Sequence, residues 1–266
     1  MRCRLLATAP LDGASNMALD EAILLLGGTT PTLRLYSWSS PCLSIGYSQE
    51  VGRDVDLDAC RRLGIGLVRR PTGGGAILHE ADMTYSLVAP ETHPAVCGSV
   101  VDSYRKVSLG LMAGLAHLGL NPEMAPAISK PVASNAACFY HPSAYELTVD
   151  GRKLAGSAQC RRQGMMLQHG SVLLEMDPSR AVEVLKPPLG EDRLSWAEGF
   201  LKRAICLREA LGKKVSFEEA ARAVGGGFRE SLGLDLDPGD LTPEELDLAR
   251  LLREEKYANS AWNLAR

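Results

Sequence analysis

Apolar residues recur along the chain at two spacings, and each spacing predicts a different kind of element. Apolar residues three or four positions apart indicate amphipathic helices, whereas alternation or a short apolar run indicates a strand. The helical spacing covers residues 16–26, 56–63 and 100–118. Strand-like runs cover residues 32–38, 42–48, 64–69, 84–89, 145–149, 152–155 and 165–175. The first two thirds of the chain therefore combine helices with strands.

Turn residues predict how some of these elements are joined. Ser39-Ser40-Pro41 separates the runs at 32–38 and 42–48, which we expect to be adjacent strands at the start of a β-meander. Asp150-Gly151 is the two-residue signal of a type I′ hairpin between the runs at 145–149 and 152–155.

The remainder of the chain is predicted to be helical. Residues 217–232 have helical spacing, but they contain Gly225-Gly226-Gly227, which favours a break in that helix. Thr242-Pro243-Glu244-Glu245 combines a capping box with proline at the first helical position, so another helix is predicted to begin there.

Composition limits the class of protein. The chain has 266 residues, is 45% hydrophobic and carries a formal net charge of −3, so it can bury a sizeable core and has no basic field for nucleic acid. Its seven cysteines include no Cys-x-x-Cys pair, which argues against a disulfide framework and a zinc site. No apolar run is long enough for a signal peptide or a membrane span. We expect a cytoplasmic protein that binds neither nucleic acid nor membrane.

The strongest chemical signal is the run Arg69-Arg70-Pro71-Thr72-Gly73-Gly74-Gly75, which lies between two strand-like segments and leads to His79. Three consecutive glycines leave the backbone N–H groups free to approach a carbonyl or phosphate oxygen closely. Dinucleotide and Walker loops open a helix, and neither of their motifs occurs in this context. The three glycines therefore fit either a loop that binds a ligand or a simple tight connection between two strands.

A second segment places a cysteine near a lysine. Cys138 follows an aperiodic loop rich in proline, serine and alanine, and the predicted hairpin then brings Arg152 and Lys153 back towards it. Positive charge lowers a thiol pKa, so Cys138 is a candidate nucleophile and Lys153 its activator or an oxyanion stabiliser. Cys160 competes, since Arg161 and Arg162 follow it, but it is predicted to lie on an exposed strand end.

The alternatives to these site roles are ordinary structural ones. Cys138 would be a small buried hydrophobic residue, and Lys153 would be a solvated hairpin lysine. The small residues Gly156-Ser157-Ala158, in a predicted turn after the strand of Lys153, leave room for another backbone or an acyl chain. His79 and His169 lie beside small-residue turns, and either of them fits a site or a structural position. Their spacing does not suggest a metal site.

At these residues the chain resembles the biotin/lipoate protein ligase and octanoyltransferase superfamily, over most of its length. The resemblance rests on several segments in a fixed order: Asn16-Met17-Ala18-Leu19-Asp20-Glu21, residues 33–38, 43–49, 69–76, Gly151-Arg152-Lys153, Gly156-Ser157-Ala158-Gln159, Leu167-Gln168-His169-Gly170, Lys256-Tyr257 and Trp262-Asn263. One segment alone would be weak, but their shared order is specific. The resemblance implies a mixed α/β (α+β) fold with a central, mostly antiparallel sheet flanked by helices.

Within this superfamily, residues 138–147 look like the octanoyltransferases that form an acyl-thioester on a cysteine. The resemblance then implies that Cys138 takes octanoate from octanoyl-acyl carrier protein. It would pass the group to a lysine of the glycine-cleavage H protein or of another lipoyl domain, in lipoate biosynthesis. Lys153 would lower the pKa of Cys138, and neither ATP nor a metal would be needed.

The same resemblance assigns the remaining site residues. Arg70, Gly73, Gly74, Gly75 and His79 would line the acyl carbonyl and chain. Gly156, Ser157 and Ala158 would form the opposite wall, and His169 would complete the pocket. Residues 1–210 would form the catalytic domain, with a core of about 28–210, and residues 211–266 a helical C-terminal extension.

Three other activities stay open. Octanoyltransferase loops of this type often have arginine after two glycines, whereas this chain has Gly73-Gly74-Gly75, as ATP-dependent lipoate ligases do. The chain could also be an amidotransferase that moves lipoyl or octanoyl groups between lipoyl domains, or an acyl-binding module without catalysis. A requirement for ATP would distinguish the ligase from the octanoyltransferase. Use of an acylated lipoyl domain as the donor would identify the amidotransferase, and absence of turnover would identify the binding module.

Overall fold

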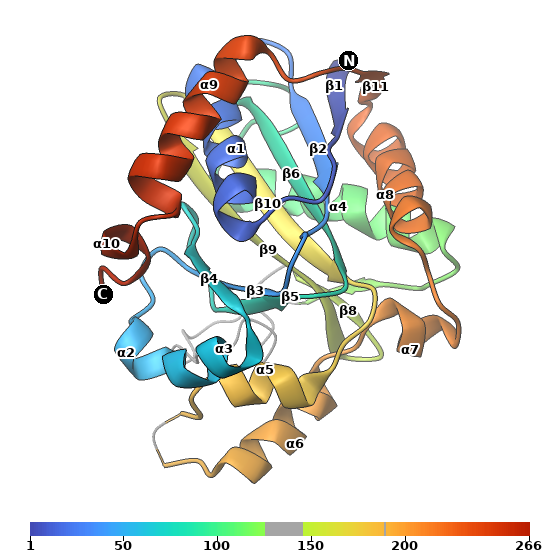
Figure 1. Ribbon diagram of the computed structural model, residues 1–266. Coiled ribbons are helices and arrows are strands. Elements are labelled where there is room, and N and C mark those ends of the chain that lie inside the picture. The colour runs from blue at the N-terminus through green and yellow to red at the C-terminus, as the bar shows by residue number, and fades with distance from the viewer. Residues whose placement is uncertain (126–145, 189) are drawn as a thin grey trace.

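The computed structural model describes residues 1–125, 146–188 and 190–266, and these are built around a large mixed sheet (Figure 1). Eight of the described strands form it, in the order β11-β1-β2-β6-β10-β9-β8-β7. The pairs β11–β1 and β1–β2 are parallel and the other five are antiparallel. The strands are β1 (Arg2–Ala7), β2 (Thr32–Tyr36), β6 (Asp82–Pro90), β7 (Glu123–Met124), β8 (Leu147–Val149), β9 (Arg152–Arg162), β10 (Met165–Leu173) and β11 (Asp235–Pro238). The predicted mixed fold with a mostly antiparallel central sheet is confirmed.

A second, three-stranded sheet has the order β4-β3-β5, and it corrects one prediction. Its strands are β3 (Cys42–Ile45), β4 (Gly66–Arg69) and β5 (Ile77–His79). The runs expected to form adjacent strands, β2 and β3, belong to different sheets, so no β-meander begins there. Alternation shows that a segment is a strand but does not name its partner. Here Ser39-Ser40-Pro41 carries the chain from one sheet to the other.

Helices cover both faces of the large sheet (Figure 1). On one face, α1 (Gly13–Leu26) contacts β6 and β10 and is covered by α9 (Pro243–Leu252). On the other face, α4 (Val100–His117) packs along α8 (Phe217–Leu232). The shorter helices are α2 (Val51–Asp54), α3 (Leu57–Leu63), α5 (Pro178–Val184), α6 (Arg193–Arg203), α7 (Leu207–Leu211), the π-helical turn Arg253–Tyr257 and α10 (Ser260–Asn263).

The glycines of α8 do not break the helix, contrary to the prediction. Helix α8 runs without interruption from Phe217 to Leu232. A Cβ added to Gly227 would lie 2.1 Å from the amide nitrogen of Gly114 and 2.3 Å from the carbonyl oxygen of Gly110, both in α4. The glycines therefore let two helix backbones approach closely, and this packing offsets their poor helix propensity.

The predicted hairpin at Asp150-Gly151 is confirmed, because both residues have positive φ, 50° and 73°, as a type I′ turn requires. It joins β8 to β9, and a similar turn at Gln163-Gly164 joins β9 to β10. Between β8 and β9 the register slips by one residue: Leu147 pairs with Ala155, and Thr148 pairs with Lys153. Leu154 is therefore the extra residue of a β-bulge.

The C-terminal segment is joined to the rest of the chain at several places. Strand β11 extends the large sheet by pairing with β1, so the prediction that this segment is entirely helical was wrong. Helix α9 lies on α1. Arg69 is fully buried and donates hydrogen bonds to the carbonyls of Trp262 and Asn263 as well as to three carbonyls of residues 46–49. The boundary near residue 210 stays a prediction.

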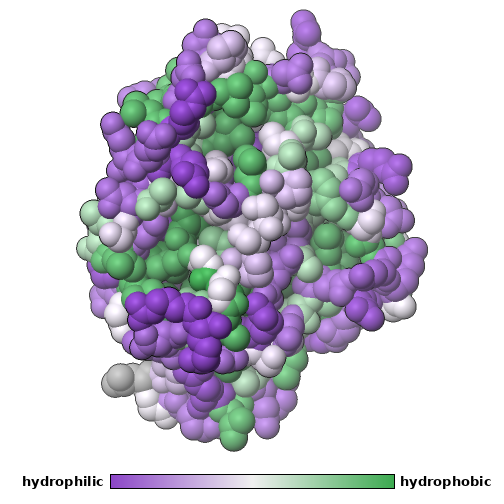
Figure 2. All heavy atoms as spheres, viewed as in Figure 1, coloured by the Kyte–Doolittle hydropathy of each residue, from purple (hydrophilic) through white to green (hydrophobic). Residues whose placement is uncertain are grey.

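The surface is mixed in character. Hydrophilic side chains dominate the periphery of the face in Figure 2, and hydrophobic ones show mainly towards its middle. Among the described residues, no helix is long and apolar enough to cross a membrane.

Candidate active site between the two sheets

A cavity opens where the small sheet faces the large one. Its walls come from strands β9 and β10, from strand β5 and from the glycine loop between β4 and β5. The lining residues are Met17, Tyr36, Trp38, Arg70, Gly74, Ile77, His79, Thr84, Gly156, Ser157, Ala158, His169, Gly170 and Ser171. Seven of the residues predicted for the site meet in this cavity: Arg70, Gly74, His79, Gly156, Ser157, Ala158 and His169.

The glycine loop is held in shape by Arg70. One guanidinium nitrogen donates to the carbonyls of Gly73 and Gly75, and the other donates to the backbone and the hydroxyl oxygen of Ser44. Among the described residues, Gly73 and Gly75 shape the loop without lining the cavity, while Gly74 lies at its wall. The predicted arginine thus organises the loop from within while also facing the cavity.

A glycine outside the loop lets it approach the small sheet. A Cβ added to Gly46 would lie 1.9 Å from the carbonyl oxygen of Gly74, so a side chain at position 46 would displace the loop. The amide of Tyr47 also donates to the carbonyl of Thr72 at 2.8 Å. The position of the loop therefore depends on residue 46.

The opposite wall is a strand and not a turn. Ala158, Ser157 and Gly156 pair with His169, Gly170 and Ser171, respectively, across β9 and β10. A Cβ on Gly170 would lie 2.4 Å from the carbonyl oxygen of Gly156. The hydroxyl of Ser157 is 2.8 Å from that of Tyr85 in the main core. Small residues keep this wall flat.

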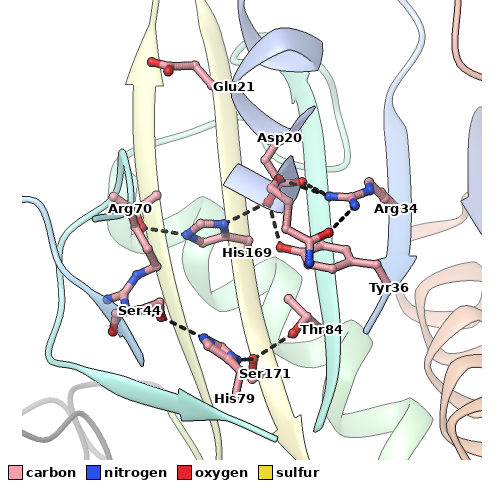
Figure 3. Close-up of polar contacts among 12 residues, drawn as sticks. Asp20, Glu21, Arg34, Tyr36, Ser44, Arg70, His79, Thr84, His169 and Ser171 are labelled. Atoms are coloured by element: carbon pink, nitrogen blue, oxygen red, sulfur yellow. Dashed lines mark hydrogen bonds and ion pairs between the residues drawn. The ribbon is translucent and has the colours of Figure 1, made fainter. Parts of the chain in front are cut away.

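His169 joins the large sheet to the glycine loop (Figure 3). Its Nδ1 lies 3.1 Å from Asp20 Oδ2, and its Nε2 lies 2.7 Å from the hydroxyl of Thr72. Because a carboxylate only accepts, Nδ1 carries the proton and Nε2 accepts from Thr72. Burial lowers the pKa of His169, consistent with this neutral tautomer. His169 therefore fixes the residue that precedes the glycines.

His79 occupies an equivalent position on the small sheet. Its Nδ1 lies 2.8 Å from Asp82 Oδ2. Its Nε2 lies 2.7 Å from the hydroxyl of Ser44 (Figure 3). The same hydroxyl oxygen also accepts from Arg70. The imidazole stacks on Trp38 with ring centroids 3.8 Å apart. Both histidines are therefore fully engaged supports of the cavity wall.

Sequence reasoning missed the buried network behind His169. Asp20 accepts hydrogen bonds from Arg34 at 2.8 Å and from Tyr36 at 2.9 Å, and Arg34 also bonds Asn16 (Figure 3). Burial opposes ionisation of Asp20, but the hydrogen bond with His169 and the charge of Arg34 outweigh it and hold the Asp20 pKa below its usual value. The sequence signal that could have revealed this network is Arg34, a polar residue within the apolar alternation of residues 32–38.

The two cysteine candidates are placed differently. Cys138 lies outside the described residues. Cys160 is half-buried within β9, which continues to Arg162, so it does not lie on an exposed strand end as predicted. Burial raises the pKa of the Cys160 thiol to about 11. Since the thiolate is the nucleophile, this setting disfavours Cys160.

Lys153 is not the solvated hairpin lysine of the alternative interpretation. Its side chain is fully buried, and its Nζ lies 2.6 Å from Oε1 of Glu146, which is also buried. Lys153 lies on β9, three residues before the cavity wall begins at Gly156. Within the described part of the chain, no cluster of histidine, cysteine and acidic residues is arranged to hold a metal ion.

Comparisons with known proteins agree with this fold. Residues 12–229 match the family described as lipoyl protein ligase A/B catalytic domain, and the chain belongs to this family. The chain is 45% identical to Octanoyltransferase LipM of Kyrpidia tusciae, covering 98% of this chain and 97% of that protein. It is 39% identical to the Bacillus subtilis protein of the same name, covering 95% and 94%.

Solved structures show the same architecture. A lipoate protein ligase from T. acidophilum with bound lipoic acid superposes with a TM-score of 0.83, at 28% identity and full coverage of both chains. A bipartite ligase from Thermoplasma acidophilum, studied with its E2 lipoyl domain, gives 0.83 at 29% identity, over 99% and 96% of the chains. The predicted superfamily is confirmed, as is the prediction of an octanoyltransferase of lipoate biosynthesis.

Proposed function

We propose that this enzyme moves an octanoyl group from octanoyl-acyl carrier protein to a lysine of a lipoyl domain, through a thioester on Cys138. The thiolate of Cys138 attacks the donor carbonyl, a new carbon–sulfur bond forms as the donor's own carbon–sulfur bond breaks, and the carrier leaves as its thiolate. The acceptor amine then attacks the thioester, an amide forms, and Cys138 is released. Splitting the transfer lets one site serve two proteins in turn.

The observation that carries this proposal is the burial of Lys153 beside the cavity. A buried ammonium in a poorly solvated site interacts strongly with nearby negative charge, so it can stabilise a thiolate or the oxyanion of a tetrahedral intermediate. The acyl chain would lie between the glycine loop and the flat wall at Gly156-Ser157-Ala158. His79 and His169 would hold these walls in place.

The partners are part of the proposal. The donor would be octanoyl-acyl carrier protein, and the acceptor would be the glycine-cleavage H protein or another lipoyl domain. Support comes from the bipartite ligase, whose own partner is an E2 lipoyl domain. The chemistry needs no ATP or metal, since a thioester is already activated for attack by an amine.

Intact-mass spectrometry tests the proposal. The wild type and Cys138→Ala are incubated with octanoyl-acyl carrier protein without nucleotide. We expect one octanoyl increment on the wild type and none on the variant. An unmodified wild type that acylates a lipoyl domain only when ATP and free octanoate are added would instead establish a ligase.

The ligase is retained as the second candidate for a specific reason. The chain has Gly73-Gly74-Gly75 in its loop, and its structural neighbours at 28–29% identity are lipoate ligases. In that activity the glycine amides and Lys153 would hold an acyl-adenylate. The nucleotide requirement in the same experiment decides between the two.

A further inference from the structure

The β-bulge in β9 determines where Lys153 points. Side chains alternate between the faces of a strand, so residues three apart normally lie on opposite faces. Leu154 and Ala155, although consecutive, both pack into the main core on the α4 side. The extra residue therefore turns Lys153 to the face that carries Gly156 and Ala158, which line the cavity.

Two further contacts fix Lys153 in this orientation. The amide of Ile205 donates to the carbonyl of Lys153 at 3.0 Å, which holds the strand just before the bulge. At the other end of the side chain, Nζ lies 2.6 Å from Oε1 of Glu146. Thr148 pairs with Lys153, and Glu146 lies two residues before Thr148, so Glu146 and Lys153 share one face.

The Glu146–Lys153 pair is almost entirely removed from solvent. The Lys153 side chain is 0% exposed and that of Glu146 is 1% exposed. An isolated buried ammonium is costly and tends to lose its proton, so a buried carboxylate in contact with it keeps it charged and restricts its rotamers. Such a pair suits a site that needs a fixed positive charge more than it suits stability.

We propose that Glu146 is the positioning residue for Lys153: it holds the ammonium, already turned by the bulge, where the acyl group is transferred. This inference rests on the proposed function, since it assumes that Lys153 acts on the thiolate or the oxyanion. It assigns to Glu146 no contact with the substrate. Loss of its charge should lower the rate of acyl transfer without weakening binding of the donor protein.

The test is a double-mutant cycle with Glu146→Gln and Lys153→Met. Each single variant is expected to slow single-turnover acylation by more than tenfold while the KM for octanoyl-acyl carrier protein stays within threefold. If Glu146 acts through Lys153, then adding Glu146→Gln to Lys153→Met should change the rate by less than twofold. The inference would be overturned if the effects of the two substitutions on the acylation rate multiplied independently. It would also be overturned if folded Glu146→Gln acylated at the wild-type rate.

Glu245→Gln is the matched control, because Glu245 is also a buried carboxylate in an ion pair, with Arg4, and it does not line the cavity. It should affect thermal stability without affecting acylation. Intact-mass measurement of the wild type separates the two proposals. If the wild type never gains an octanoyl group, the proposed function fails, whereas equal acylation of wild type and Glu146→Gln refutes only the role of Glu146.

Discussion

Replacing Gly46 with alanine perturbs the glycine loop without touching any group that is proposed to take part in chemistry. The new Cβ would be placed 1.9 Å from the carbonyl oxygen of Gly74, whereas atoms in ordinary contact are about 3.5 Å apart. The backbone at position 46, just after β3, and the loop at position 74 must then separate by roughly 1.5 Å. Both belong to backbone, so no side-chain rotation can relieve the clash.

Two effects follow from that separation. Overpacking of this kind costs about 1–3 kcal/mol of folding free energy. A misplacement near 1 Å in a site that orients its substrate costs roughly a hundredfold in rate. We therefore expect Gly46→Ala to remain folded at 25 °C, with a melting temperature lower by roughly 2–4 °C per kcal/mol lost. Acyl transfer should fall by about two orders of magnitude.

The assay combines thermal unfolding with single-turnover acylation from octanoyl-acyl carrier protein. Gly52→Ala is the control, since a Cβ at Gly52 meets nothing within 4 Å and its backbone is not in the left-handed region. That variant should keep wild-type acylation. If folded Gly46→Ala acylates at the wild-type rate, the glycine loop does not have to lie against residue 46 for catalysis, and this account of the site is wrong.

Three other predictions follow from the described contacts. Gly227→Leu should separate α4 from α8 and lower the melting temperature strongly, while the protein that stays folded keeps its acylation rate; selective loss of rate would contradict this. Cys138→Ala should abolish acyl transfer and Cys160→Ala should retain it, as measured by intact mass; the reverse result would move the nucleophile to Cys160. Because the pKa of His169 is lowered in the folded protein, the unfolded chain binds the extra proton first, so stability should fall as the pH drops below about 6.5. His169→Gln should remove that part of the pH dependence of thermal unfolding, and an unchanged profile would show that His169 is not its source.

Local sequence rules predicted most elements of the fold. The hairpin at Asp150-Gly151, the helix that begins after Thr242 and the placement of the glycine loop between strands are all confirmed. Each depends on turn or capping chemistry within a few residues. Pairing of β2 with β3 was wrong because strand partners depend on contacts far along the chain. The predicted break at Gly225 to Gly227 was wrong because tertiary packing against α4 overrode helix propensity.

The site was predicted in part for the same reason. Glycine, histidine and lysine were recognisable as candidates from type and spacing, and seven of the predicted residues line one cavity. The supporting residues could not be recognised in this way, because Asp20, Arg34 and Tyr36 meet only after α1 and β2 pack together. The bulge at Leu154 was equally hidden, since an extra residue in a strand leaves no composition signal.

The carbonyl contacts of Arg69 also have a consequence for how the enzyme matures during synthesis. The side-chain oxygen of Asn263 accepts a hydrogen bond from the backbone amide of Arg69, and Asn263 lies 194 residues further along the chain. At about 5–20 residues per second, a ribosome needs roughly 10–40 s to make that stretch. During that interval Arg69 and the glycine loop beside it lack the C-terminal carbonyls that complete their support. The glycine loop is thus among the last parts of the molecule to gain its full set of tertiary contacts.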